Sequence, residues 1–273
     1  MDKNFSVSMS VYFKDNPENF NTALKSILNQ TLIPSELILV VDGPVGIETN
    51  KVIDNFKKEC SFLKLIKLKK NLGHGNARRV GLSNCTNNIV ALMDSDDISV
   101  RNRFELQIDY LQKNPQVSLV GGQIEEFEGT IDNIISKREV PQFDHQIKEY
   151  LKYRCPINQM TVMFRKNKVV EAGGYLDWYC NEDYYLWIRM ALNNNKFHNI
   201  SETLVYFRVD LNMYKRRGGI KYFKSEYRIQ KLMMEKRLIS FYIFIKNITI
   251  RFIIQILMPP IIRKIIFLKF ARK

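Results

Sequence analysis

An α/β fold with a mostly parallel central sheet flanked by helices, followed by a basic amphipathic helical tail, is the architecture that this sequence predicts. Three features predict it. Apolar runs alternate with segments of helical periodicity over residues 1–100. Two of the runs end directly at an acidic residue, Asp42 and Asp94, and no acidic residue follows Glu235. Strands separated by helices form parallel βαβ units, whose ligands bind at the carboxyl ends of the strands.

The N-terminal elements alternate along the chain. A strand at 7–12 is followed by a helix at 18–30, whose apolar residues recur at helical spacing: Phe20, Leu24, Ile27 and Leu28. The continuous apolar run 36–41 predicts a buried strand. The alternation is completed by a helix at 47–60, a strand at 62–68, a helix after Gly75 and the apolar strand 88–93.

Further elements are expected beyond this strand. A helix begins near Arg101, and residues 117–124 have the composition of a strand. The acidic residues that follow this strand are expected to form a solvated hairpin: Glu125, Glu126 and Glu128. A last helix begins at Asp183 and carries an apolar face formed by Leu186, Trp187, Met190 and Ala191.

Length and cysteine content limit the class of protein. At 273 residues the chain can bury the core of one large α/β domain or two small ones. Its cysteines (Cys60, Cys85, Cys155 and Cys180) are widely spaced without a CxxC pair, which favours reduced thiols in a cytosol over a disulfide framework or a zinc site. The first residues lack a basic region followed by an apolar stretch, so no signal peptide is expected.

The net positive charge lies entirely in the C-terminal part. Residues 1–210 contain 26 Lys and Arg and 26 Asp and Glu, so their charges cancel. Residues 211–273 contain 16 Lys and Arg and two acidic residues, Glu226 and Glu235, and so carry the whole net charge of +14.

The same C-terminal part predicts amphipathic helices. Its apolar runs, 238–245 and 252–262, are shorter than the about 20 residues that span a bilayer as a helix, and Pro259-Pro260 is expected to break the second. Apolar faces flanked by cations are typical of helices in a membrane interface, so residues 240–273 are expected to bind an anionic membrane surface. Alternatively, the apolar residues pack on the preceding domain. A nucleic-acid partner is not expected, because the segment is rich in Ile, Leu and Phe.

Alternating carboxylates follow the strand that ends at Met93. Asp94 and Asp96 flank Ser95, and Asp97 comes next. Two alternating carboxylates on a loop can turn their oxygens toward one Mg²⁺ or Mn²⁺, which usually bridges two phosphates of a nucleotide. The alternative is an acidic N-cap for the helix that follows.

A glycine-bearing loop, residues 71–81, opens the helix after Gly75. It matches neither the Walker pattern nor GxGxxG. Its glycines would let the backbone approach a ligand, and Arg78 or Arg79 would face a phosphate or a base. The alternative is a plain turn with solvated arginines, in which His74 is a loop residue rather than a ligand.

Several short motifs occur in a fixed order along residues 5–210. They are SVSMSVY at 6–12, ALKSILNQT at 23–31, PSELILVVDG at 34–43, NLG at 71–73, AR at 77–78, MDSDD at 93–97 and EDYYLW at 182–187. Together they resemble the motifs of family 2 glycosyltransferases with the GT-A fold. Further segments are similar to the amylovoran-type branch, which builds bacterial capsular and exopolysaccharide repeat units: 10–12, 41–44, 161–164, 173–175 and 216–219.

The resemblance implies a nucleotide-sugar site formed by Tyr12, Asp42, Gly73, Arg78, Asp94 and Ser95. Tyr12 and Asp42 would contact the uracil, with Arg78 close to it. Asp94 would reach the ribose, and Asp96, together with Asp94, would bind the metal on the diphosphate. Asp97 would cap the loop or orient its neighbours.

The resemblance also places the catalytic base on Asp183, with Glu182 as the fallback. One base without a covalent nucleophile implies direct displacement with inversion at the anomeric carbon. A helix N-terminus would keep the Asp183 carboxylate ionised. Without the resemblance, such a pair before a helix would be a capping pair.

Two positions depart from the branch. Gln159 stands where the branch more often has histidine, and Leu92 where it more often has arginine. Both are expected near the sugar pocket, where they affect donor or acceptor identity.

The sequence therefore predicts a metal-dependent inverting glycosyltransferase that moves a sugar from a UDP-sugar to a lipid-linked saccharide in capsule, exopolysaccharide or O-antigen synthesis. Residues 1–210 would form the catalytic domain, with 1–110 binding the nucleotide sugar and 111–210 supplying the acceptor side and the base. Residues 211–273 would hold it on the cytoplasmic face of a bacterial cell membrane. One alternative is a sugar nucleotidyltransferase, but such an enzyme needs a glycine-rich loop directly after the first strand, and residues 13–17 do not supply one. The other alternative is a non-catalytic membrane- or nucleic-acid-binding module.

Overall fold

The computed structural model describes residues 3–209, 217–259 and 262–263. Its first elements alternate as the sequence predicts. They are β1 (Ser6–Val11), α1 (Pro17–Leu28), β2 (Glu36–Val41), α2 (Ile47–Glu59), β3 (Leu63–Lys67), α3 (His74–Asn84) and β4 (Ile89–Met93). The start of α1 shows why the chain turns helical there, because the Asn16 side chain accepts hydrogen bonds from the backbone N–H groups of Glu18 and Asn19.

The second part is more irregular. Its elements are β5 (Ile98–Ser99), α4 (Arg103–Lys113), β6 (Val117–Phe127), β7 (Ile134–Arg138), α5 (Asp144–Leu151), the 3₁₀ turn η1 (Gln159–Thr161), β8 (Met163–Arg165), α6 (Lys166–Glu171), α7 (Glu182–Leu192) and β9 (Lys196–Arg208). The C-terminal part forms α9 (Ile220–Glu235), α10 (Phe241–Phe252) and the π-helical turn η2 (Ile253–Leu257).

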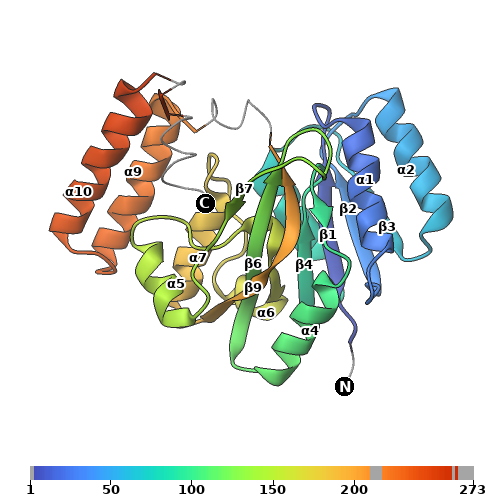
Figure 1. Cartoon of the computed structure of the whole chain (residues 1–273), viewed down its shortest axis with the longest axis horizontal. Coiled ribbons are helices and arrows are strands. Elements are labelled where there is room, and N and C mark those ends of the chain that lie inside the picture. The colour runs from blue at the N-terminus through green and yellow to red at the C-terminus, as the bar shows by residue number, and fades with distance from the viewer. Residues whose placement is uncertain (1–2, 210–216, 260–261, 264–273) are drawn as a thin grey trace.

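Nine strands of the described residues form one sheet, in the order β3-β2-β1-β4-β8-β6-β9-β5 with β7 paired to β6. The neighbours β3, β2, β1 and β4 are parallel, as predicted. The sheet is mixed beyond β4, because β8 is antiparallel to both β4 and β6. Figure 1 shows β1 and β4 side by side, with β6 and β9 beyond β4. The strand order changes direction at β1, and in such sheets ligands bind at the carboxyl ends of the strands beside this point.

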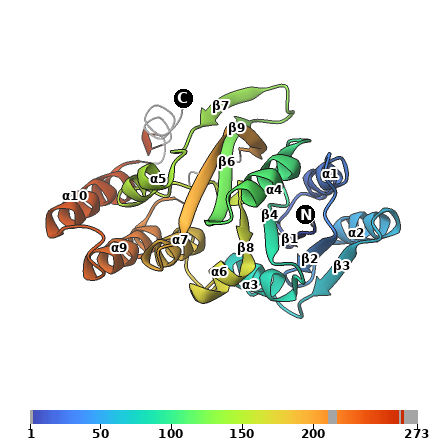
Figure 2. The ribbon, with the colours of Figure 1, turned by 90° about the horizontal axis from the view of Figure 1, so that it is seen from below.

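Helices cover both faces of the sheet. Alternate residues of each strand point to opposite faces. Leu37 and Leu39 pack in a cluster with α1, α2 and α4, whereas Ile38 and Val40 pack in a second cluster with α3, α5, α6, α7 and α9. Figure 2 shows α9 and α10 side by side at the end of the molecule opposite α2 and β3.

Close packing sets the position of α3 on the sheet. A Cβ atom added to Gly81 would lie 2.2 Å from Ser8 Oγ on β1 and 3.6 Å from Val40 Cγ2 on β2. Only glycine allows the helix to approach this closely. The N-terminus of α3 is thereby brought to the carboxyl ends of β1 and β4.

The predicted solvated hairpin is wrong for Glu126. The strand β6 continues to Phe127, and the Glu126 side chain is fully buried with its Oε2 accepting a hydrogen bond from Ser136 Oγ at 2.6 Å. The physical reason is that β6 is flanked by β7 on one side and by β9 on the other at this position. Glu128, beyond the strand, is exposed.

The inner faces of α9 and α10 pack on the domain. Ile229, Met233 and Phe244 belong to the second core cluster. Asn247 Nδ2 donates to the Lys152 carbonyl oxygen at 2.9 Å and to Gln230 Oε1 at 2.8 Å. The packing alternative is therefore correct for these residues.

The outer face of α10 and η2 is exposed and apolar. Its large side chains with at least two fifths of their surface exposed include Phe241, Tyr242, Ile245, Phe252, Ile253 and Leu257. In the part of the chain that the structure describes, no helix has both the length and the apolar character needed to cross a membrane. The predicted hinge before Ile261 and the basic residues 264–273 lie outside the described residues.

Candidate active site

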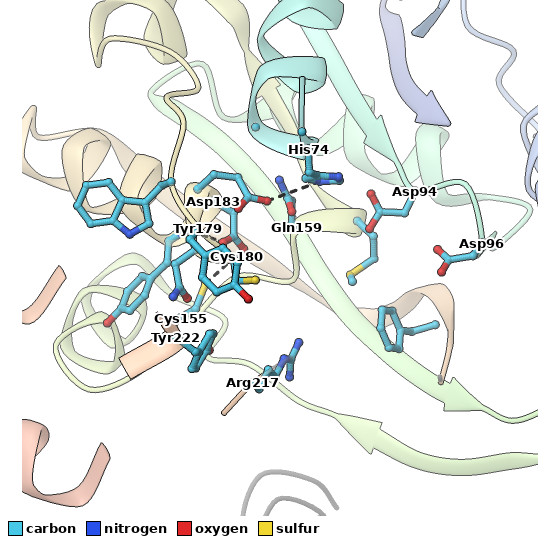
Figure 3. Close-up of a pocket in the computed structure, with 18 of the residues that line it drawn as sticks. His74, Asp94, Asp96, Cys155, Gln159, Tyr179, Cys180, Asp183, Arg217 and Tyr222 are labelled. Atoms are coloured by element: carbon cyan, nitrogen blue, oxygen red, sulfur yellow. Dashed lines mark hydrogen bonds and ion pairs between the residues drawn. The ribbon is translucent and has the colours of Figure 1, made fainter. Parts of the chain in front are cut away.

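A cavity of about 1280 Å³ opens at the carboxyl ends of β1 and β4. Its wall includes Tyr12, Asp94 and Asp96 at one end and Asp183 further along. Figure 3 shows Asp94 and Asp96 on one side of Asp183, with Cys155, Tyr222 and Arg217 on another. The volume exceeds the range of roughly 300–1,000 Å³ that holds one drug-sized ligand, so there is room for more than one substrate.

Asp94 is oriented by a buried arginine. Arg78 pairs with the Asp94 carboxylate and donates to the Ser8 carbonyl oxygen at 2.9 Å and to the Met93 carbonyl oxygen at 3.0 Å. These carbonyls lie on β1 and β4, so one guanidinium ties both strands to the loop after β4. Because only 1 % of the Arg78 side chain is exposed, it lies behind the cavity wall, and its predicted contact with a base stays a prediction.

Asp97 holds the loop of residues 94–97, the acidic loop, against β9. Its Oδ1 accepts a hydrogen bond from the Arg208 backbone N–H at 2.9 Å, and Arg208 Nε donates to the Asp96 carbonyl oxygen at 3.0 Å. The Asp97 side chain is buried, and burial, followed by the charges of Asp96 and Asp94, raises its pKa well above the usual range. Asp97 therefore fixes the position of the loop that carries the neighbouring carboxylates, which fits the expectation that it orients its neighbours.

Ser95 and Tyr12 meet at a residue that the sequence did not single out. Asp15 Oδ2 accepts hydrogen bonds from Ser95 Oγ at 2.7 Å and from the Tyr12 backbone N–H at 3.0 Å. Asp15 also lines the cavity. The only signal was its place in the turn between the first strand and helix, which does not distinguish it from other turn aspartates.

Asp42 anchors the glycine-bearing loop. Its Oδ1 accepts from the Leu72 backbone N–H at 2.7 Å, and its Oδ2 accepts from the Gly73 backbone N–H at 3.1 Å and from Asn71 Nδ2 at 3.0 Å. Gly73 adopts a φ of +88°, which L side chains rarely adopt. Asp42 and Gly73 both line the cavity, and the loop is therefore a shaped part of its wall rather than a solvated turn.

Glu182 and His74 join the N-termini of α7 and α3. Glu182 Oε1 lies 3.7 Å from His74 Nε2, and His74 Nε2 accepts a hydrogen bond from Arg78 Nε at 3.4 Å. The Glu182 side chain is 11 % exposed. Burial, followed by the charge of Asp183, raises the pKa of Glu182 to about 8, so this carboxyl is protonated at neutral pH.

Burial also raises the pKa of Asp183. The Tyr184 backbone N–H, which donates to Asp183 Oδ1 at 2.7 Å, and then Arg138 and Arg217 favour the charged form and so oppose this rise. The Cys155 Sγ lies 3.9 Å from Asp183 Oδ2, and burial, followed by the Asp183 charge, raises the pKa of this thiol, which stays protonated.

The carboxylates after β4 suit a metal that arrives with a phosphate ligand. The described residues contain no group of three or more His, Cys, Asp or Glu side chains that could hold a metal. Mg²⁺ and similar ions are often bound by one or two carboxylates plus the phosphates of a substrate. Asp96, with Asp94 beside it, provides this donor set, and the acidic end of the cavity would repel a diphosphate in the absence of a cation.

Most of the predicted site residues line one cavity: Tyr12, Asp42, Gly73, Asp94, Ser95, Asp96, Glu182 and Asp183. Gln159 also lines it, as expected of a residue near the sugar pocket. Leu92 is fully buried in the second core cluster, so its expected place beside the sugar is wrong; its position on β4 points it between the sheet and the helices.

Comparisons with known proteins point to one family. The family model described as glycosyl transferase family 2 matches residues 6–171. The chain is similar to the UDP-Gal:alpha-D-GlcNAc-diphosphoundecaprenol beta-1,3-galactosyltransferase of Escherichia coli, with 38 % identity over 269 residues that cover 98 % of this chain and 97 % of that protein. It is also similar to the amylovoran biosynthesis glycosyltransferase AmsE of Erwinia amylovora, with 37 % identity over 230 residues that cover 84 % and 85 % of the two chains.

A solved structure shares the fold. The crystal structure of S. aureus TarS 1–349 in complex with UDP-GlcNAc aligns with a TM-score of 0.65, covering 92 % of this chain and 72 % of that chain. The sequence identity is 18 %, so this likeness concerns the fold alone.

Proposed function

The chain belongs to glycosyl transferase family 2, and on this premise we propose that it moves a sugar from a UDP-sugar to a hydroxyl of a lipid-linked saccharide, with inversion at the anomeric carbon. The observation that carries the proposal is one cavity that contains both the carboxylates after β4 and the carboxyl pair Glu182 and Asp183. Family membership removes the nucleotidyltransferase and the non-catalytic module as alternatives.

Each end of the cavity has its own task in the transfer. Asp94 and Asp96 would hold a divalent ion, Mn²⁺ or Mg²⁺, that arrives with the UDP-sugar. When bound, this ion supplies Lewis-acid stabilisation of the departing diphosphate. Tyr12, Asp42 and the loop at Gly73 form the wall against which the uridine lies. The hydrogen bond between Ser95 and Asp15 fixes the acidic loop relative to this wall.

Asp183 is the base. It accepts the proton of the acceptor hydroxyl as the hydroxyl oxygen forms its bond to the anomeric carbon, while the bond from that carbon to the diphosphate oxygen breaks and UDP leaves with the electron pair. Glu182 is neutral at neutral pH, so it serves as a hydrogen-bond donor beside the reacting sugars rather than as a second base. Because the acceptor oxygen attacks the anomeric carbon from the side opposite to the departing diphosphate, the configuration inverts.

The relatives suggest the acceptor. The Escherichia coli protein is named for a GlcNAc-diphosphoundecaprenol acceptor, and this chain covers 97 % of its length. We propose an acceptor of the same class, a saccharide joined through a diphosphate to a polyprenol, in the synthesis of a surface polysaccharide.

Substitution of Asp96 and Asp183 tests the roles separately. Asp183→Asn is expected to abolish transfer to GlcNAc-diphosphoryl lipid while UDP still binds in the presence of Mn²⁺, because the base lies away from the acidic loop. Asp96→Asn is expected to abolish the Mn²⁺-dependent part of UDP binding, measured by calorimetry, and transfer with it. The matched control is Asp54→Asn, which changes an exposed carboxylate on α2. Full transfer by either site variant, in a screen of UDP-sugars, would contradict the assignment.

We further propose that the outer face of α10 and η2 lies on an anionic membrane surface at the cytoplasmic face, where a lipid-linked acceptor is located. The exposed residues Phe241, Ile245 and Leu257 form an apolar face with Lys246 beside them, and such a face binds at the boundary of headgroups and acyl chains. The double variant Phe241→Ser and Ile245→Ser is expected to lose sedimentation with anionic vesicles.

The control for this experiment is Val170→Ser, which removes an equally exposed apolar side chain on α6. Unchanged sedimentation of the α10 double variant would contradict membrane binding by this face. A concentration-dependent dimer that the same double variant abolishes would assign the face to a second copy of the chain instead.

A further inference from the structure

Two sets of lining residues carry opposite charge, and the other charged lining residues are Glu128, Asp177, Glu182, Asp183 and Arg208. Between residues 10 and 96 the lining residues include four aspartates and one lysine, Lys14. Between 138 and 157 and between 217 and 263 they include five arginines and one carboxylate, Glu226. A cavity that has one acidic and one basic set of lining residues can bind two anionic ligands, one together with a cation and the other through its arginines.

Two of the five arginines hold the C-terminal elements. Arg251 on α10 forms an ion pair with Glu226 on α9, with 2.5 Å between Arg251 Nε and Glu226 Oε2. Arg263 donates to the carbonyl oxygens of Ile254, Gln255 and Met258, and so caps the end of η2. The other three, Arg138, Arg154 and Arg217, which also interact with neighbouring groups, line the same cavity and are named the basic wall.

The basic wall adjoins the base. Arg138 Nη2 donates to the Cys155 carbonyl oxygen at 2.9 Å, Arg154 precedes Cys155 in the chain, and Cys155 Sγ lies 3.9 Å from Asp183 Oδ2. Figure 3 shows Arg217 on the Cys155 and Tyr222 side of Asp183, away from Asp94 and Asp96. All three arginines are partly exposed and line the cavity, so their guanidinium groups can reach a ligand there.

Beyond the basic wall the cavity reaches the C-terminal helices. Ile250 on α10 and Ile254 on η2 line it, and the adjacent residues Phe252, Ile253 and Leu257 are exposed on the outer apolar face. The lining therefore combines the base, guanidinium groups and apolar side chains of the C-terminal helices. A saccharide linked through a diphosphate to a lipid offers a hydroxyl, phosphates and hydrocarbon to these three kinds of group.

On the basis of the proposed function, we propose that Arg138, Arg154 and Arg217 form a binding site for the diphosphate of the acceptor. A diphosphate bound there places the acceptor sugar at Asp183 and directs its lipid toward α10 and η2. Guanidinium groups bind phosphate oxygens through paired, charge-assisted hydrogen bonds. The donor diphosphate has a different counter-charge, the divalent ion at Asp96. The two diphosphates are thus kept at opposite ends, with the reacting carbon between them.

Binding of two matched probes tests this site. The first probe is GlcNAc joined through a diphosphate to a short alkyl chain, and the second is the alkyl glycoside of GlcNAc without the diphosphate. Arg138→Gln, Arg154→Gln and Arg217→Gln are each expected to weaken binding of the first probe about tenfold, because each removes a hydrogen bond to a charged group. Binding of the second probe and of UDP with Mn²⁺ should not change. Arg101→Gln, at an exposed arginine outside the cavity, is the control for loss of charge.

Three results would overturn the inference. They are equal weakening of both probes, weakening of UDP binding in place of the first probe, and unchanged binding in all three variants. Arg217→Lys, which keeps the charge but not the paired hydrogen bonds, is expected to weaken the first probe less than Arg217→Gln, and this ordering excludes misfolding as the cause. The assay needs no transfer. A wild-type chain that binds the first probe through these arginines but transfers no sugar would therefore refute the proposed function and leave this site standing.

Discussion

Replacement of Glu182 by Gln is expected to remove a loss of stability that the native chain suffers as pH rises. Burial, followed by the charge of Asp183, raises the pKa of this carboxyl from 4.5 to about 8. The unfolded chain releases the proton near the lower value, whereas the folded chain retains it until about the higher one. Because the folded state binds the extra proton in this interval, the free energy of unfolding falls as pH rises through it.

The structure bounds the size of this effect. The interval between the two pKa values is about 3.5 pH units, and each unit corresponds to 1.36 kcal/mol, which gives at most about 5 kcal/mol. Asp183 shares the proton, and the cavity admits water to the pair, so we expect about 2–4 kcal/mol. Glutamine has the same shape and cannot ionise. Relative to the native chain, the Glu182→Gln variant should be only slightly more stable near pH 5 and more stable by this amount near pH 8.

Urea unfolding followed by the fluorescence of the buried Trp187 measures both chains at each pH. Titration of groups far from Glu182 is common to the two chains and cancels in their difference, whereas Asp183 titrates together with Glu182 and is part of the effect measured. Glu59→Gln, which replaces an exposed carboxylate on α2 by the same amide, is the matched control for the substitution. A difference between Glu182→Gln and the native chain that stays constant from about pH 5 to about pH 8 would refute the raised pKa.

Three further outcomes are expected. Gly81→Ala should lower the free energy of unfolding by about 1–3 kcal/mol, because its Cβ would lie 2.2 Å from Ser8 Oγ; an unchanged urea midpoint would show that α3 can shift at no cost. Arg251→Ala should cost about 3–5 kcal/mol by leaving the buried Glu226 carboxylate unpaired, and a simultaneous Glu226→Gln change should recover part of it in the same assay. Chelation of divalent ions should abolish sugar transfer, and added Mn²⁺ should restore it; transfer that persists in chelator would contradict the role given to Asp96.

The parallel half of the fold was predictable because its signals are local. β2 and β4 are short apolar runs, β1 and β3 mix apolar with polar residues, and each intervening helix shows its own periodicity or turn residues. The order of motifs led to the family and to the GT-A fold, which the family match and the relatives confirm. The mixed half was less predictable, because β8 is only three residues long and is fixed by pairing with β4 and β6, strands far from it in sequence.

The same difference separates the site residues. Asp94, Asp96 and Asp183 could be named from motifs, because the residue type and its place after a strand or before a helix are properties of the chain. Arg78 and Leu92 belong to equally clear motifs, yet the structure places Arg78 behind the cavity wall and Leu92 in the core. Which way a side chain points at a strand end depends on the neighbouring strands and helices.

The sequence alone determined the class of fold, the carboxylates of the site, the family and the confinement of net charge to the C-terminal part. Tertiary structure decided which carboxyl is neutral, since burial beside Asp183 raises the pKa of Glu182. It also decided that Arg138, Arg154 and Arg217 share one wall with Asp183. These residues come from three distant segments, and only packing brings them within reach of one ligand, because electrostatic interactions depend on distance in space and on burial rather than on separation along the chain.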